Sequence, residues 1–69
     1  MATMIFVREL YGEGYKKEKR LMVNADHITI CNRDDGSVMT FMALLDNREF
    51  YIKERLDDIY YMASPTQTG

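Results

Sequence analysis

The sequence of 69 residues contains a single histidine and a single cysteine, the side chains best suited to catalysis or metal binding. His27 follows Asp26, but adjacent residues of a strand point to opposite faces, and no serine lies near them in sequence to act as a nucleophile. One histidine and Cys31 do not supply the four ligands of a structural zinc site. Only Arg33 lies close enough in sequence to lower the pKa of the Cys31 thiol, so we expect Cys31 to pack rather than react. The sequence therefore predicts no catalytic residue, no metal ligand and no cofactor.

Two segments superficially resemble ligand-binding loops. Asn32 and Asp34-Asp35 offer oxygen ligands, but the alternating pattern closed by a distant glutamate, which calcium loops need, is missing. Gly12-Glu13-Gly14 lacks the third glycine and the Lys-Ser or Lys-Thr pair of a phosphate-binding loop. We interpret both segments as turns.

A basic strip offers one way to bind a partner. It is flanked by Tyr11 and Tyr15 and consists of four residues: Lys16, Lys17, Lys19 and Arg20. In nucleic-acid-binding proteins, basic side chains bind phosphates and neighbouring aromatic rings stack on bases. However, Glu13 and Glu18 dilute the strip, and the chain has nine basic against eleven acidic residues, a net charge of -2. A solvated loop is the simpler interpretation of the strip, and a small nucleic-acid-binding β protein is the alternative function.

The first half of the chain predicts strands that position these residues. A β-branched and aromatic run predicts a strand over residues 4–10. The polar, glycine-punctuated stretch 11–20 predicts an exposed loop or flared hairpin. Alternating apolar residues predict short strands around 21–23 and 28–30, joined by a tight turn at 24–26 where Asn and Asp favour it.

The second half predicts a hairpin followed by a helix. Asp35-Gly36 favours a tight primed turn, and residues 38–45 then predict a strand whose two faces are both apolar and both need cover. A helix is the alternative for this segment, because it contains good helix formers. A return strand is expected over 49–52, and helical spacing begins at Glu54.

The predicted fold is mainly β (α+β): a small antiparallel sheet or partly open barrel of four to five strands with one short C-terminal helix. We expect residues 1–62 to form a single domain and residues 63–69 to form a flexible tail.

Three segments give the sequence a family resemblance. They are Met4-Ile5-x-Val7-x-x-Leu10-x-Gly12, Leu21-x-Val23-Asn24-Ala25-Asp26-x-Ile28 and Ile52-Lys53-Glu54-Arg55-Leu56-Asp57-Asp58-Ile59. Their order resembles that of the small flagellar and swarming-motility proteins called FlbD-like. The chain departs from the family pattern at three places. Residues 13–19 are an insertion, Asp46-Asn47-Arg48 replaces the Asn-Gly turn of the family, and Arg55 occupies a position where the family usually has serine. The resemblance implies a compact β domain with a C-terminal helix, no catalysis, and a setting in bacterial motility.

Large apolar side chains exceed what so small a domain can bury. The sequence has six Met, five Tyr and three Phe, and a chain of this length buries only about 60% of the surface that its unfolded form exposes. Met and Tyr suit a surface that another protein covers. We therefore expect a non-enzymatic interaction or regulatory protein that forms a homo-oligomer or binds another protein. Its setting would be bacterial motility or the inhibition of a host protein by a phage-encoded chain. The predicted partner-binding residues are Met39, Phe41, Met42, Tyr60 and Tyr61.

The compartment follows from what the sequence lacks. A lone cysteine forms no intrachain disulfide, the first six residues have no signal-peptide pattern, and the longest apolar run, 38–45, is too short to span a bilayer. We expect a cytoplasmic protein with no membrane partner.

Overall fold

A computed structural model describes residues 3–63 of the chain and confirms the mainly β fold with a C-terminal helix. Its elements are β1 (Met4–Tyr11), the 3-10 turn η1 (Glu13–Tyr15), β2 (Lys17–Asn24), the 3-10 turn η2 (Ala25–His27), β3 (Ile28–Asn32), β4 (Thr40–Leu44), β5 (Glu49–Ile52) and α1 (Leu56–Ala63). The expected loop or flared hairpin at 11–20 is the end of a hairpin, because its last four residues belong to β2. Ala63, expected in the tail, ends α1, and the rest of that tail lies outside the described residues.

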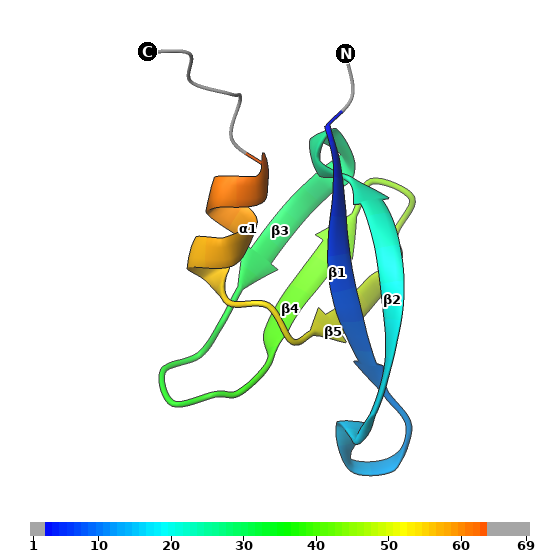
Figure 1. Ribbon diagram of the computed structural model, residues 1–69, viewed down its shortest axis with the longest axis vertical. Helices are drawn as coiled ribbons and strands as arrows, with labels where there is room; N and C mark the ends of the chain where they lie inside the picture. The colour runs from blue at the N-terminus through cyan, green and yellow to red at the C-terminus, as the bar shows by residue number, and fades with distance from the viewer. Residues whose placement is uncertain (1–2, 64–69) are drawn as a thin grey trace.

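All five strands form one open antiparallel sheet in the order β2-β1-β5-β4-β3. The β1–β2 hairpin is in register along its whole length, from Met4 opposite Asn24 to Tyr11 opposite Lys17. By contrast, β1 pairs with β5 only at Glu9 and Leu10. The sheet is therefore a long hairpin and a three-stranded part joined along a short seam, and the two parts diverge from that seam in Figure 1.

The core lies on the inner face of this curved sheet. Alternation along the strands selects its members, which are Ile5, Val7, Val23, Met42, Leu44 and Ile52, together with Ile59 from the helix. Ile59 is the one buried residue of α1, and burying a side chain of this size contributes about 1.5–3 kcal/mol. The helix thus adds a single anchor to the core, and it contacts β1.

The turn at residues 24–26 forms, but its role differs from the sequence expectation. Asn24 Oδ1 accepts a hydrogen bond from Asp26 N at 2.9 Å, as an Asn-initiated turn requires. However, β2 and β3 are the two outermost strands, so η2 carries the chain from one edge of the sheet to the other instead of reversing it. Backbone hydrogen bonds from Ala25 N to Thr3 O and from Leu45 N to His27 O attach η2 to both parts of the sheet.

The segment 38–45 is a strand, as expected, but a shorter one. Val38 and Leu45 lie outside β4 and are 76% and 61% exposed. A turn does form at Asp35-Gly36, where Ser37 N donates to Asp34 O at 3.0 Å and Gly36 has a φ of 81°. It is not the tight primed turn that was expected, because Asp35 has no positive φ and the β3–β4 connection spans residues 33–39. Arg33 and Ser37 explain the longer loop: Arg33 Nε donates to Ser37 O at 2.9 Å, and the Ser37 hydroxyl bonds the backbone of residue 39.

Candidate interaction surface

The outer face of the β1–β2 hairpin carries an apolar surface, which we call the hairpin patch: Met4, Phe6 and Met22. Phe6 lies directly opposite Met22, and Met4 lies on the same face of β1, two residues before Phe6. The intervening residues of both strands point into the core, so these three side chains face away from it and are 50–52% exposed. The Arg20 guanidinium lies 5.3 Å from the centre of the Phe6 ring.

Two strand edges flank the sheet, and they differ. β2 is eight residues long and pairs with β1 without interruption. β3 is five residues long, and its register with β4 shifts between Ile28 and Ile30. Short length and a bulge both disfavour pairing with another chain. The β2 edge, which borders the hairpin patch, is therefore the better template for an added strand.

The five partner-binding residues predicted from the sequence do not share one surface. Met42 is 0% exposed because the positions 40, 42 and 44 of β4 face the core, so its predicted surface role is wrong for the monomer. Phe41 points to the opposite face and is half-buried, with its ring 5.7 Å from that of Tyr51. Met39 is half-buried in the β3–β4 connection. Tyr60 and Tyr61 are exposed on α1, with their rings 5.7 Å apart.

The basic strip lies mostly within β2, where alternation distributes it over two faces. Lys19 lies 3.9 Å from a carboxylate oxygen of Glu9 on the neighbouring strand, and its ammonium is 5.2 Å from the centre of the Tyr11 ring. Glu18 binds Lys53 at 3.3 Å on the other face. Because acidic residues interleave the strip and pair with its neighbours, it presents no continuous row of free cations to a phosphate backbone.

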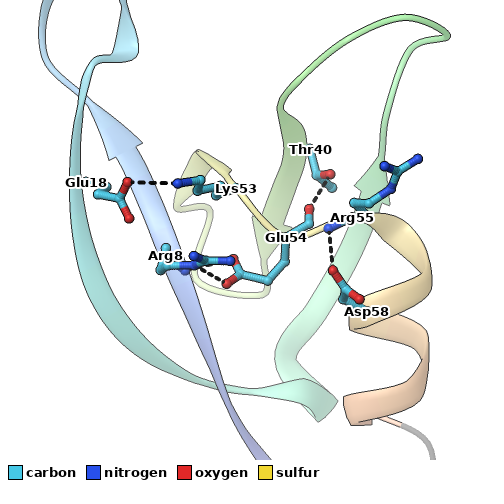
Figure 2. Close-up of polar contacts among 7 residues, drawn as sticks. All are labelled: Arg8, Glu18, Thr40, Lys53, Glu54, Arg55 and Asp58. Atoms are coloured by element: carbon cyan, nitrogen blue, oxygen red, sulfur yellow. Dashed lines mark hydrogen bonds and ion pairs between the residues drawn. The ribbon is translucent and has the colours of Figure 1, made fainter.

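A buried carboxylate closes the seam where β5 leaves β1 (Figure 2). Glu54 is 9% exposed, and its two carboxylate oxygens accept hydrogen bonds from Arg8 N and Arg8 Nε, each at 2.8 Å. The ion pair raises the pKa of the Arg8 guanidinium above its ordinary value. The Glu54 carboxylate therefore takes the place that a strand partner would otherwise fill beside β1.

Backbone and hydroxyl contacts fix the same turn of the chain. The Thr40 hydroxyl, which is fully buried, donates to the Glu54 backbone oxygen at 2.6 Å. At the start of α1, Asp58 Oδ2 accepts from Arg55 N at 3.1 Å, which is the second half of a capping box (Figure 2). Within residues 3–63, no buried side-chain nitrogen or oxygen lacks a partner. This network positions the helix, and its polar atoms are already engaged with one another.

The chemistry-bearing residues singled out in the sequence lie apart from that network. His27 Nε2 is 3.4 Å from Asn24 Nδ2 in the exposed turn η2. Cys31 is half-buried in β3, and burial raises the pKa of its thiol. Among the described residues, no three His, Cys, Asp or Glu side chains gather as a metal site would require. Over the same residues, no helix has the length and apolar character needed to cross a membrane.

Comparison of the chain with protein-family models, with curated proteins and with solved structures finds no match. The likeness to FlbD-like proteins stays a resemblance of sequence motifs. The hairpin patch was missed by sequence reasoning, although residues 4–7 have apolar side chains on both alternating sets, the same signal that singled out residues 38–45.

Proposed function

We propose that this protein is a small, non-catalytic interaction protein that binds a second copy of itself through the hairpin patch and the adjoining β2 edge. One observation carries the proposal: Phe6 and Met22 form a cross-strand apolar pair, about half exposed, beside an uninterrupted edge strand. Single exposed apolar residues are ordinary on protein surfaces, but contiguous ones mark interaction sites. Two-fold dimers are the commonest assemblies of small chains.

The sequence of β2 favours one register for such a dimer. If two β2 strands pair antiparallel about Met22, then Leu21 of each copy lies beside Val23 of the other, and Arg20 lies beside Asn24. Among the pairs that lie within β2 on both copies, apolar residues then meet apolar residues, and no like charges are opposed. Centring the pair between Glu18 and Lys19 would instead bring Lys17 against Arg20. The Met22-centred register also joins the two hairpin patches into one surface.

This role fits a regulatory protein whose assembly state or exposed face controls another protein. The FlbD-like resemblance would place that activity in bacterial flagellar or surface motility. Inhibition of a host protein by a phage-encoded chain is the other setting we carry forward from the sequence.

Sedimentation velocity over a range of concentrations tests the proposal. We expect a monomer–dimer equilibrium for the natural sequence and a shift to monomer for Met22→Lys, which brings two ammonium groups together at the two-fold axis. Val38→Lys is the matched control, because it removes an exposed apolar side chain from a loop. Ile30→Lys makes the same change on the β3 edge. Both should leave the dimer intact, and circular dichroism should show that every variant is folded.

A strict monomer at all concentrations would refute self-association. Loss of the dimer in Ile30→Lys but not in Met22→Lys would move the interface to β3. The nucleic-acid alternative is tested with a labelled oligonucleotide at rising salt concentration, because phosphate contacts weaken steeply with salt. Salt-sensitive binding that disappears when Lys16, Lys17, Lys19 and Arg20 become Ser would favour that alternative over the present proposal.

A further inference from the structure

A groove of about 380 Å³ opens where the β1–η1 end of the hairpin meets β5 and β4. Its lining includes five aromatic and two acidic residues: Tyr11, Tyr15, Phe41, Phe50, Tyr51, Glu9 and Glu49. This groove lies outside the hairpin patch and contributes nothing to the function proposed above. Its composition, rings with carboxylates, is the one that recognises organic cations.

The rings stand in a fixed arrangement around Tyr51. The Tyr15 ring is 5.2 Å from that of Tyr51 at 72°, and the Phe41 ring is 5.7 Å from it at 64°, both edge-to-face. Phe41 and Tyr51 lie opposite each other on neighbouring strands. Edge-to-face packing leaves part of each negative ring face available to a cation. None of the three rings is fully buried, so a ligand can reach them.

The loop that places Tyr15 adopts an unusual backbone conformation. Tyr15 has a φ of 55°, a region that costs a non-glycine residue energy, and Tyr15 N donates to Gly12 O at 3.0 Å. Gly12 itself has φ 81° and ψ -177°, which is accessible essentially to glycine alone. The chain thus folds η1 back so that an exposed tyrosine meets Tyr51, and such strain is concentrated where side chains are positioned for binding.

Charge in the groove is complementary to a cation. The chain's own Lys19 ammonium already lies against the Tyr11 ring and the Glu9 carboxylate at one end. Glu49 lies on β5 two residues from Tyr51, on the same face, is exposed, and makes no ion pair with any described residue. One acidic residue beside the aromatic cluster is therefore left for a ligand.

We infer that this groove binds a cationic side chain, arginine or lysine, presented by a partner protein. The cation lies against the rings of Tyr15, Phe41 and Tyr51, and Glu49 supplies the opposing charge. Because the groove and the hairpin patch are separate, dimerisation and cation binding can succeed or fail independently.

Two-dimensional NMR titration of the full chain tests this inference. The probe is the capped pentapeptide Gly-Gly-Arg-Gly-Gly, and the control probe carries citrulline, the neutral isostere of arginine, in place of Arg. We expect saturable shifts centred on Tyr15, Tyr51 and Glu49 with the arginine peptide. Glu49→Gln and Tyr15→Asn should each weaken binding by about two- to fivefold. Asn keeps the left-handed conformation of that position while it removes the ring.

Two control variants make the test specific. Asp57→Asn removes one negative charge from the start of α1, outside the groove, and should leave peptide affinity unchanged. Met22→Lys should abolish the dimer and still bind the arginine peptide, which separates this inference from the proposed function.

Three results would overturn the inference. Equal shifts with the citrulline peptide would show that charge is irrelevant, and unchanged affinity in Glu49→Gln and Tyr15→Asn would place binding elsewhere. Shifts with tetramethylammonium chloride but none with the arginine peptide would show that the groove takes a small free cation and not a protein side chain.

Discussion

The hydroxyl of Thr40 offers the sharpest test of how the seam is stabilised. Thr40 is 0% exposed, and its hydroxyl is the donor to the Glu54 backbone oxygen, at the point where β5 ends and the chain turns toward α1. Thr40→Val has nearly the same shape and removes only the hydroxyl. The substitution therefore leaves the buried Glu54 carbonyl without this donor while the apolar packing around it is retained.

The expected magnitude follows from burial. Leaving a buried acceptor unsatisfied costs about 1–3 kcal/mol, and the added methyl recovers part of that, so we expect a loss of about 1–2 kcal/mol of unfolding free energy. For a domain of this size that is a fall in Tm of roughly 4–8 °C for each kcal/mol. Thr29→Val is a matched control, because the exposed Thr29 makes the same kind of bond, its hydroxyl donating to Ala43 O at 3.2 Å. At an exposed position the same change should cost less than about 0.5 kcal/mol.

Urea unfolding followed by far-ultraviolet circular dichroism measures both variants. The protein concentration must be the same throughout, because a dimer makes apparent stability depend on concentration. Thr40→Ser, which keeps the hydroxyl and loses the methyl, separates the hydrogen bond from packing. If Thr40→Val costs no more than Thr29→Val, or costs less than Thr40→Ser, the reasoning that the buried hydrogen bond stabilises the seam is wrong.

Three further perturbations probe the seam, the strained loop and the thiol. Glu54→Ala should destabilise the fold more than Glu54→Gln, because glutamine still offers an acceptor to Arg8 N; equal urea midpoints would contradict this. Gly12→Ala should cost about 1–3 kcal/mol, because its φ of 81° with ψ of -177° disfavours any Cβ, and near-ultraviolet circular dichroism should show the tyrosine packing change. Iodoacetamide should label Cys31 more slowly in the folded protein than in urea, since burial raises the pKa of the thiol. The folded pKa of the Cys31 thiol is then above its unfolded pKa. The contribution of this group to stability is therefore complete below the unfolded pKa and declines as pH rises through the folded pKa. A urea midpoint that rises over that range relative to Cys31→Ser would show the opposite sign.

Local signals predict most of the elements but not their order in the sheet. Alternating apolar residues and turn-forming Asn, Asp and Gly act over a few positions, which is why strands are found where they were expected at 4–10 and 49–52. The pairing of β1 with β5 depends on two residue pairs far apart in the chain, Glu9 with Ile52 and Leu10 with Tyr51. No periodicity in the sequence encodes such a contact. The turn at Asn24 was therefore predicted correctly, but the sequence did not predict that this turn connects β2 and β3, the two edge strands of the sheet.

The surface residues show the same division between local and long-range information. Apolar residues on both alternating sets of 38–45 predict cover on two faces, but only the pairing with β5 decides that Met42 faces the core and Phe41 faces outward. In the sequence, Glu54 is an ordinary acidic residue near the start of a helix. In the structure its carboxylate accepts a hydrogen bond from Arg8 N, 46 positions earlier in the chain. Its burial follows from where β5 leaves the sheet, which depends on the whole fold.

Packing within a single copy covers only about half of the hairpin patch. Outward positions of a strand make no contact with the core, so polar residues at Met4, Phe6 and Met22 would leave the inner packing of β1 and β2 unchanged. The outward position Lys53, which follows β5 and pairs with Glu18, is polar in this way. Residues 3–63 contain a single α-helix, which is anchored by one residue, so this part of the chain supplies no second layer to cover the outside of the hairpin. Because these side chains are still about half exposed, a second surface that removed them from water would lower the free energy further.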